Sequence, residues 1–348
     1  MNRVKLAVVG VGALGQHHAR ILAAMPGVEL VGVVDSREEQ GREIAARFGT
    51  KWFASPDQIQ PLVQGVVIAV PTIHHHDVGL PFLEAGIPVL MEKPLANSLQ
   101  AAQTLQRMAS FRRTTLQVGH VERFNPAFEL LQQKIDRPLY IRAQRVSPYT
   151  FRSTDIGVVH DLMIHDIDLI LALTGESIIS VEAFGAVTFG PHEDMAMARL
   201  KTSTGIIADI TASRMSPVAD RTFQVFSTNG CVTADLNLRT VSSWKPAVPL
   251  AANPSLVQHI IAATPDPLTL KNEVFTKWIT NETVQASSAD ALTAELDDFV
   301  RCIRTNARPR VSGEDAVKSL EVADRVLVGM AKWSWQDKIP GFAATKAA

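Results

Sequence analysis

The stretch Lys5-Leu-Ala-Val-Val-Gly-Val-Gly-Ala-Leu-Gly15 decides the fold of this chain. An apolar run of strand length leads into the glycines, and helical spacing follows over Ala13–Met25. Glycines at this spacing permit a tight turn, a close approach of phosphate to the backbone, and close packing of a helix on a strand. Asp35 ends the next apolar run about 20 residues after the last glycine, where such folds place a carboxylate that binds a ribose. The segment predicts a dinucleotide-binding unit.

The first 120 residues alternate apolar runs with helical stretches. The apolar runs are Lys5–Val9, Glu29–Val34, Val66–Val70, Val89–Glu92 and Thr115–Gly119, and the helical stretches are Ala13–Met25, Arg37–Phe48, His75–Ala85 and Leu99–Phe111. Continuous apolar strands that alternate with helices indicate a parallel sheet that is covered on both faces. We therefore expect an α/β fold here, a doubly wound Rossmann domain over residues 1–121.

The pattern changes after residue 121. One helical stretch, Asp161–Leu173, is followed by consecutive strand-like runs over residues 179–235. Residues 245–270 show no clear period, and we expect an irregular excursion there. Two helical segments close the chain, Ala289–Thr305 and Gly313–Lys332. Because strands without intervening helices indicate antiparallel or mixed pairing, we expect residues 122–348 to form an α+β domain with a large, mostly antiparallel sheet.

The composition is typical of a globular protein without a strong overall field. The 348 residues exceed what one hydrophobic core usually supports, which favours two domains. The 34 Lys and Arg nearly cancel the 35 Asp and Glu, so the chain has no overall field to attract nucleic acid or an anionic membrane, although this balance still allows a local basic groove. Cys231 and Cys302 provide neither a disulfide framework nor a zinc site. No run approaches the roughly 18 apolar residues of a membrane span, and we expect a cytoplasmic protein.

The residues around Asp35 bear on which dinucleotide binds. A carboxylate at this position hydrogen-bonds the ribose hydroxyls of NAD and repels the 2′-phosphate of NADP. Ser36 and Arg37 act in the opposite direction, because an arginine here can pair with that phosphate. We expect NAD, with NADP as the less favoured alternative. The candidate cofactor residues in this part of the chain are Gly10, Gly12, Ala13, Leu14, Gly15, Asp35, Ser36 and Arg37.

Two further segments carry groups for acid–base chemistry. Glu92-Lys93-Pro94 follows a parallel strand, at the edge where open α/β sheets bind ligands. Asp161 and His165 lie four residues apart, on one face of a helix. Transfer of a hydride from a C–H bond to a nicotinamide requires a base for the hydroxyl proton and a positive group for the developing alkoxide. Histidine suits the first task and lysine the second, but the reverse assignment, with Lys93 as the base, stays open.

With these motifs the chain resembles the Gfo/Idh/MocA family of glucose–fructose oxidoreductases and inositol dehydrogenases, over essentially its whole length. Val70-Pro-Thr-Ile-His-His75, Leu83-Glu-Ala-Gly86 and Glu92-Lys93-Pro94 are similar to the family's nicotinamide-side segments in order and spacing. The segment from Asp155 to His165 is similar to its glycine-rich Asp/His motif. The resemblance implies an NAD-dependent dehydrogenase that acts on a sugar hydroxyl.

The resemblance also implies roles for individual residues. Lys93 and His165 are then the catalytic pair, Asp161 assists in binding a substrate hydroxyl, and the Lys93–Pro94 peptide is expected to be cis. Pro71, Thr72, His75, Glu92 and Lys93 join the cofactor site. The implied substrate residues are Lys93, Arg123, Asn125, Asp161 and His165.

One departure narrows the resemblance. The family motif usually opens with three glycines, whereas Asp155 and Ile156 occupy the first two positions here. This variant, together with Gly119-His-Val-Glu-Arg-Phe-Asn-Pro126, resembles the subgroup that contains UDP-N-acetylglucosamine 3-dehydrogenases. We therefore expect a sugar or nucleotide-sugar substrate, with a UDP-N-acetyl amino sugar oxidised at C3 as one candidate. Other sugars and inositol-like polyols are the alternatives.

Several residues also have a purely structural interpretation. His74-His75-His76 cannot converge on one ion, because neighbours on a helix point about 100° apart, and we expect no metal. Asn125 precedes Pro126, which is equally typical of a helix N-cap. Arg145, Tyr149 and Arg152 could meet a diphosphate or serve only the fold.

Other function classes stay open as well. A regulatory protein that senses NAD is one, although it would have no use for Lys93, Asp161 and His165. Glycoside cleavage by transient oxidation, or reduction of a non-sugar such as biliverdin, would be a different reaction on the same scaffold. We also expect a homo-oligomer, a dimer or a tetramer, because the strands of residues 179–235 lack a helical layer on one side and an uncovered sheet face needs burial.

Overall fold

The computed structural model describes residues 3–150, 156–189, 191–247, 255–263 and 266–332. The chain divides into two compact units. The first unit comprises Met1–Phe124 and Ala289–Asp324, and the second comprises Asn125–Ser288 and Arg325–Ala348. The sequence places one boundary near residue 121, and the structure differs in returning residues 289–324 to the first unit. Within the described residues, no helix is long and apolar enough to cross a membrane.

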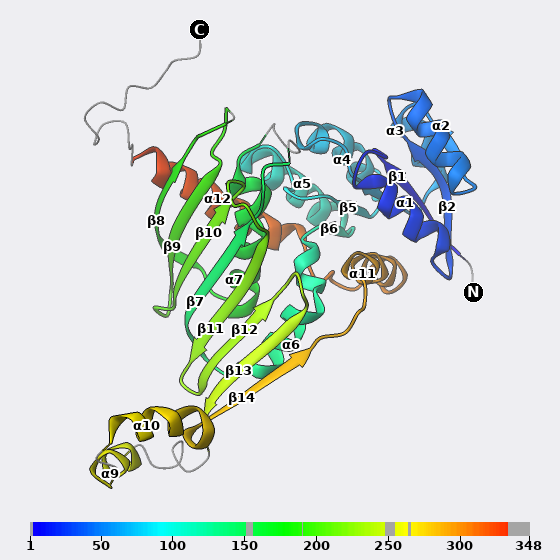
Figure 1. The fold of residues 1–348 in the computed structure, drawn as a ribbon. Helices are drawn as coiled ribbons and strands as arrows, with labels where there is room; N and C mark the ends of the chain where they lie inside the picture. Colours follow the sequence, from blue (N-terminus) through cyan, green and yellow to red (C-terminus); the bar gives the residue numbers. More distant parts are fainter. Residues whose placement is uncertain (1–2, 151–155, 190, 248–254, 264–265, 333–348) are drawn as a thin grey trace. The chain divides into compact units, whose positions relative to one another are not determined.

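The first unit is a parallel α/β sheet with the strand order β3-β2-β1-β4-β5-β6 among the described residues (Figure 1). Its strands are β1 (Val4–Val9), β2 (Val28–Val34), β3 (Lys51–Phe53), β4 (Gly65–Ile68), β5 (Val89–Met91) and β6 (Leu116–Val118). Its helices are α1 (Gly15–Ala24), α2 (Glu38–Arg47), α3 (Pro56–Ile59), α4 (His75–Glu84) and α5 (Leu99–Arg112). The strand order reverses between β1 and β4, and ligands bind at such a switch point beyond the carboxyl ends of the strands.

Helix α11 (Ala291–Thr305) explains why the last part of the chain returns to the first unit. Its residues Leu296, Phe299 and Val300 are buried in the same apolar core as Leu22 and Leu90. Burial of each such side chain stabilises the fold by about 1.5–3 kcal/mol. An amphipathic pattern predicts this helix but not the surface on which it docks, because that surface is formed by residues some 200–300 positions earlier in the sequence.

The second unit contains a mostly antiparallel sheet, in which only β7 and β10 pair in parallel among the described strands. The strand order is β14-β13-β12-β11-β7-β10-β9-β8. The strands are β7 (Pro138–Val146), β8 (Ile178–Ala186), β9 (Met195–Thr202), β10 (Ile207–Ser213), β11 (Asp220–Ser227), β12 (Gly230–Asp235), β13 (Thr240–Pro246) and β14 (Ile279–Gln285). The predicted combination of a Rossmann sheet with a second, mostly antiparallel sheet is confirmed.

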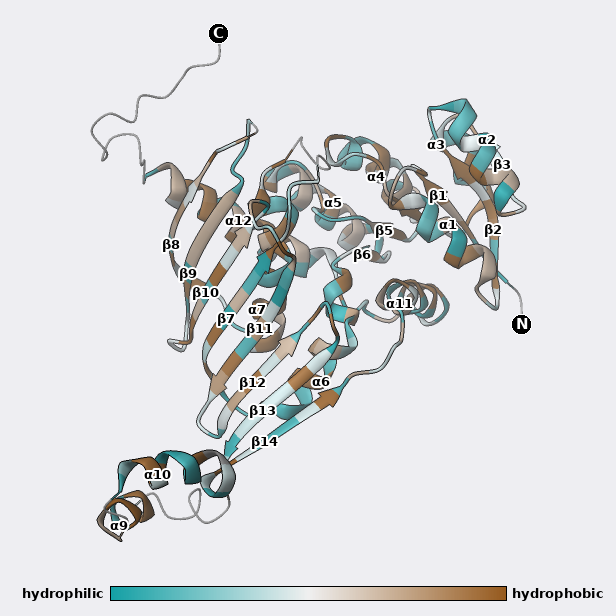
Figure 2. Ribbon diagram, in the orientation of Figure 1, coloured by the Kyte–Doolittle hydropathy of each residue, from teal (hydrophilic) through white to brown (hydrophobic). Residues whose placement is uncertain are grey.

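The two faces of the second sheet differ in character. Alternate residues on β7, β10 and β11 are buried, among them Ile141, Ile210 and Phe223. Helix α6 (Pro126–Lys134) packs on this inner face, where the ring of Phe128 meets that of Phe223 edge-on at 5.7 Å. Helix α7 (Ile164–Thr174) packs on β7 and β10. The residues between the buried ones point outward, which gives the alternation of hydropathy along the strands in Figure 2.

Between β13 and β14 the structure differs from the irregular excursion expected at residues 245–270. The described residues of this part form α9 (Leu256–Ala263) and α10 (Pro267–Glu273). A local signal for the second helix is present in the sequence. Asp266 accepts hydrogen bonds from the backbone N–H groups of Leu268 and Thr269, and Pro267 occupies the first helical position. Helix α12 (Gly313–Ala331) closes the described chain.

Candidate active site

The loop after β1 has the backbone geometry that the glycine pattern predicts. Gly10 has φ +83°, and a Cβ atom there would lie 2.8 Å from the carbonyl carbon of Ala69. A Cβ atom on Gly15 would overlap the carbonyl oxygen of Gly10. The first glycine therefore makes the turn beside the end of β4, and the last one lets α1 begin directly against the strand.

Asp35 organises this loop from the end of β2. Its side chain is buried, and its Oδ2 accepts the backbone N–H of Val11 at 3.0 Å. Its Oδ1 accepts the backbone N–H of Arg37 at 2.9 Å. The Arg37 side chain is 66% exposed, and its Nε lies 3.5 Å from Asp35 Oδ1. The carboxylate thus ties the end of β2 to the turn after β1, with one arginine beside it.

The residues of the loop fit a bound dinucleotide. A Cβ atom on Gly12 would have one neighbour within 4 Å, the flexible end of the Arg37 side chain, so its backbone is open to an approaching group. Helix α1 carries no acidic residue in its first turn, and the positive end of its dipole favours an anion. Ala13 and Leu14 are exposed on the same loop, as is Ser36 beyond Asp35. Several backbone groups thus remain available for phosphates.

Lys93 follows β5, and the side chain of the preceding residue, Glu92, hydrogen-bonds to its backbone. The peptide between Lys93 and Pro94 is cis, as expected. The Glu92 carboxylate is buried, accepts a hydrogen bond from His18 Nε2 at 2.7 Å, and accepts the backbone N–H of Lys93 at 3.2 Å. Burial raises the pKa of Glu92, but the hydrogen bond from His18 and the charges of His18 and Lys93 outweigh burial and leave the pKa lowered. Glu92 is therefore an interior carboxylate that supports the backbone of Lys93.

His75 supports the same segment from α4. Its ring is 1% exposed, with Nδ1 at 2.9 Å from the carbonyl oxygen of Pro94 and Nε2 at 2.9 Å from that of Val70. Burial is the main reason that the pKa of His75 is lowered. A neutral ring carries one N–H and donates to one of these carbonyls at a time. Of the neighbouring residues predicted to bind cofactor, Thr72 is buried and Pro71 is exposed.

Arg123 belongs to the first unit and Asn125 to the second, since the chain passes from one unit to the other between them. Asn125 caps α6, because its Oδ1 accepts the backbone N–H of Ala127 at 3.0 Å. Its Nδ2 donates to the carbonyl of Leu236 at 3.0 Å. Asn125 is therefore a helix N-cap, and both polar atoms of its side-chain amide form hydrogen bonds within the second unit. The carbonyl of Arg123 accepts a hydrogen bond from Arg310 within the first unit, and the Arg123 side chain is half-buried. A substrate role for either residue stays a prediction.

The Asp/His motif forms the start of α7 in the second unit. A π-helical turn, Val159–Met163, carries Asp161 and leads directly into α7, which carries His165. Such π turns occur often at functional sites. Asp161 and His165 are half-buried, whereas Asp166 and Asp168 are buried. The two residues predicted to act on substrate are therefore accessible to solvent, as His160 of the same segment also is.

Glu193 holds the π-helical turn in place. Its Oε1 accepts the backbone N–H of Val159 at 3.1 Å, and its carbonyl accepts that of Val158 at 3.0 Å. A Cβ atom on Gly157 would overlap the Glu193 carboxylate. The remaining glycine of the motif is thus required by close approach of a buried acid. The motif's opening residue, Asp155, lies outside the described residues.

Two buried arginines fix the surroundings of this motif. Arg145 forms a bidentate pair with Asp166, at 3.1 Å and 2.8 Å, which joins β7 to α7. Arg214 donates to Asp194 at 2.6 Å and to the carbonyl of Ile156 at 3.2 Å, and its guanidinium lies 4.9 Å from the ring centre of Tyr149. The guanidinium of Arg145 thus has a structural role, which is one of the two roles that the sequence allows for it. Arg152 lies outside the described residues.

Sequence reasoning did not find Glu193, Asp194 or Arg214. They lie on or beside strands, 28 to 49 residues after His165, in segments with no local motif. Their only sequence signal is a charged residue at a position where strand alternation predicts burial, as for Arg214 after β10. In the described residues no three His, Cys, Asp or Glu side chains gather as a metal would need.

Comparison with known proteins places these features in one family. Residues 4–120 match the model of an oxidoreductase family with an NAD-binding Rossmann fold, Gfo/Idh/MocA, and residues 132–233 match the model of a Gfo/Idh/MocA C-terminal domain. The chain belongs to the Gfo/Idh/MocA oxidoreductase family. Its first unit is accordingly an NAD-binding Rossmann domain, and the predicted family, enzyme class and cofactor are confirmed.

Two relatives in this family match the chain over more than nine-tenths of its length. UDP-N-acetylglucosamine 3-dehydrogenase of Acidithiobacillus ferrooxidans is 31% identical, over 95% of this chain and 98% of its own. A solved structure of that protein, GnnA, superposes with a TM-score of 0.84 over 95% of this chain and 99% of the other. The scyllo-inositol 2-dehydrogenase (NAD(+)) of Bacillus subtilis is 28% identical, over 92% of each chain. The chain is thus an NAD-binding oxidoreductase of the Gfo/Idh/MocA family, and both of these relatives are named as dehydrogenases.

Proposed function

We propose that this protein is an NAD-dependent dehydrogenase that oxidises the C3 hydroxyl of a UDP-N-acetyl amino sugar to a ketone. The observation that supports this most is the full-length similarity, at 31% identity, to a UDP-N-acetylglucosamine 3-dehydrogenase. The variant opening of the Asp/His motif, Asp155-Ile156-Gly157, points to the same subgroup.

The chain's own residues supply the proton chemistry. Bound NAD would accept the hydride that leaves the sugar carbon. As that C–H bond breaks, the hydroxyl proton must pass to a base, and we assign this step to His165. Lys93 holds the same oxygen through a charged hydrogen bond and so stabilises its developing negative charge. Asp161 binds a neighbouring hydroxyl. The products are a ketone, the reduced cofactor and one proton.

A substrate panel tests this proposal. Purified protein with NAD is mixed with UDP-N-acetylglucosamine, UDP-N-acetylgalactosamine, UDP-glucose, or scyllo- or myo-inositol, and NADH absorbance is followed. We expect kcat/KM for the best UDP-N-acetyl sugar to exceed that for either inositol by at least about 100-fold. NAD binding without turnover of any sugar would favour a sensor, and glycoside cleavage without net NADH would favour transient oxidation. Either result would overturn the proposal.

A polyol dehydrogenase is the second candidate. Its support is the 28% identity to scyllo-inositol 2-dehydrogenase over 92% of both chains. The two candidates differ in whether the substrate carries a diphosphate. Competition by UDP alone separates them, because UDP should inhibit turnover of a nucleotide sugar and leave inositol oxidation unchanged.

NAD should bind more tightly than NADP, since the Asp35 carboxylate repels a 2′-phosphate. Asp35→Asn keeps one oxygen as an acceptor for the loop but removes the charge, so we expect the ratio of the two Kd values to narrow by about tenfold. Arg37→Ala is the matched control, and it should widen the ratio because it removes a cation whose Nε lies 3.5 Å from Asp35 Oδ1. Isothermal titration calorimetry measures the Kd values for NAD and NADP of each protein. Equal affinities in the unmutated protein would contradict the assignment.

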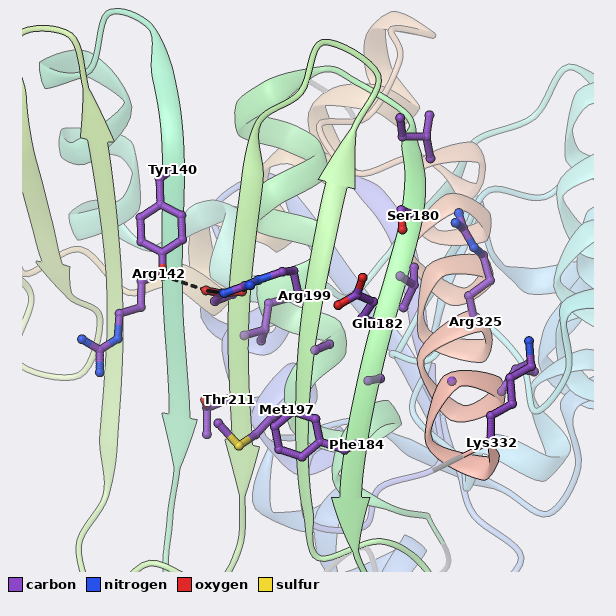
Figure 3. A pocket seen from close by; sticks show the side chains of 18 residues that line it. Tyr140, Arg142, Ser180, Glu182, Phe184, Met197, Arg199, Thr211, Arg325 and Lys332 are labelled. Atoms are coloured by element: carbon purple, nitrogen blue, oxygen red, sulfur yellow. Dashed lines mark hydrogen bonds and ion pairs between the residues drawn. The ribbon is translucent and has the colours of Figure 1, made fainter. Parts of the chain in front are cut away.

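We also propose that the outer face of the second sheet is a homo-oligomer interface. A broad depression of about 1050 Å³ lies there over β7–β10, beside the end of α12 (Figure 3). Arg199 forms two hydrogen bonds with Asp209, at 2.7 Å and 2.8 Å, and the Tyr140 hydroxyl donates to the same carboxylate. Around these paired charges the face exposes large apolar side chains, including Ile179 and Phe184. A face that combines large exposed apolar side chains with paired charges is typical of an interface.

A charge placed on this face should separate the subunits. Phe184 is 37% exposed, and Phe184→Asp buries a carboxylate if two copies meet there. Sedimentation velocity at micromolar concentration should show a dimer or tetramer for the unmutated protein and a monomer for the variant. Phe111→Asp is the control, because Phe111 is 78% exposed on α5 of the first unit. A monomeric unmutated protein would contradict the proposed interface.

A further inference from the structure

Helix α11 carries a buried acid that the proposed reaction does not use. Glu295 is 0% exposed, and neither of its carboxyl oxygens has a hydrogen-bond partner among the described residues. Its backbone carbonyl accepts a hydrogen bond from Gln117 Nε2 on β6 at 2.9 Å. Buried carboxyl groups of this kind are rare unless paired, and each calls for an explanation.

The explanation begins with the neighbouring carboxyl group, that of Glu92. It receives the His18 ring from α1 and the backbone N–H of Lys93, as described above. Gly119, two residues after Gln117, completes its surroundings, because a Cβ atom there would lie 2.9 Å from Glu92 Oε2. The end of β6 therefore lies against both acids, with Gln117 on the backbone of Glu295 and Gly119 on the carboxylate of Glu92.

Both carboxyl groups are buried, and the charge of Glu92 acts on Glu295, so charging both at neutral pH is unfavourable. The charge belongs on Glu92, which has two donors, and the proton belongs on Glu295. Burial raises the pKa of Glu295 well above its ordinary value, and the charges of Glu92 and then Asp298 raise it further. The lowered pKa of Glu92 agrees with this division of charge.

We propose that Glu295 is a positioning residue for Lys93: as an uncharged carboxylic acid it leaves the negative charge on Glu92, which holds the Lys93 backbone and His18. This inference rests on the proposed catalytic role of Lys93. If Glu295 loses its proton, a second charge enters the same buried space. One acid must then regain a proton or move, and the hydrogen bond from the Lys93 backbone is weakened.

The groups that face this acid pair come from four elements. They are His18 on α1, Glu92 and Lys93 after β5, Gln117 on β6, and Asp298 on α11. Because the pKa of Glu295 is higher in the folded protein than in the unfolded chain, the folded state binds this proton more tightly. The resulting stability is fully present below about pH 4.5 and is lost progressively as pH rises toward the folded-state pKa.

Glu295→Gln tests the inference, because an amide has the shape of the protonated acid and cannot ionise. The unfolding equilibrium constants of the variant and the unmutated protein are compared without cofactor. We expect them to be equal at about pH 5, and the variant's constant to be lower by about tenfold or more at about pH 9. Glu295→Met is also uncharged at this position, and it should show the same gain in stability at alkaline pH. Asp297→Asn is the control, since Asp297 is exposed on the same helix, and its effect should not change with pH. Equal pH dependence in all proteins would overturn the inference.

Two further measurements separate a positioning role from a purely structural one. In a Glu92→Gln background, Glu295→Gln should give a smaller gain in stability at alkaline pH, because the charge of Glu92 no longer opposes ionisation of Glu295. An unchanged gain would show that Glu295 does not act through Glu92. With substrate, Glu295→Gln should keep kcat within about twofold near neutral pH and move the alkaline limb of kcat to higher pH. An unmoved limb overturns the positioning role. The unfolding measurements need no substrate, so the failure of the proposed sugar oxidation would be recognised separately.

Discussion

Lys93→Met should lower kcat by about 10²–10³-fold, the usual loss when a donor to a developing oxyanion is removed. Methionine keeps the length and the apolar stem but cannot donate a hydrogen bond or carry charge. The segment around Lys93 is held by Glu92 and His75, through bonds that do not depend on the lysine side chain. The variant should therefore fold normally and bind NAD with a Kd within about threefold of the unmutated value.

Steady-state kinetics with the best sugar of the panel, and titration calorimetry with NAD, measure the two effects. Lys51→Met is the matched control, because Lys51 is an exposed lysine on β3 of the same unit. If Lys93→Met turns over substrate at nearly the normal rate, Lys93 is not catalytic. If it loses NAD binding in parallel with kcat, its role is in the cofactor site alone.

His165→Ala should lower kcat by about 10²–10⁴-fold, the range for loss of a positioned general base. The acid limb of a plot of log kcat/KM against pH reports protonation of that base in the free enzyme. With His165 as the base, His165→Ala loses the acid limb and Lys93→Met retains it. The reverse outcome would assign the base to Lys93. His259→Ala is the control, because His259 is an exposed histidine on α9.

A variant of the Asp/His segment could lose activity because the turn unfolds or because the catalytic side chain is missing, and the melting temperature distinguishes these two causes. Asp161 and His165 depend on the turn that Glu193 and Gly157 fix. Loss of this turn would lower the melting temperature, whereas loss of the half-buried His165 side chain should leave it nearly unchanged. A His165→Ala protein with normal stability and near-normal turnover would remove His165 from the mechanism.

The sequence by itself determined the first sheet, the dinucleotide loop and the family. These features rest on a short motif with fixed spacing. Gly10 turns the backbone with a φ of +83°, Gly15 begins α1 against the Gly10 carbonyl, and the Asp35 carboxylate accepts the backbone N–H of Val11. The motifs around Lys93 and His165 were recognisable for the same reason. Even the cap at Asp266 was present in the sequence, although it was not recognised.

The tertiary structure alone decided which side chains support the reacting groups. Glu92 and Asp35 are interior anchors as well as candidate cofactor residues, Asn125 is a cap, and Arg145 is paired with Asp166. Glu193 and Glu295 reach their positions because a strand and a helix pack against elements far away in sequence. Periodicity predicts that a helix such as α11 has an apolar face, but the partner of that face depends on the shape of the assembled core. A buried acid such as Glu295 therefore acquires its neighbour, and its proton, only when the chain has folded.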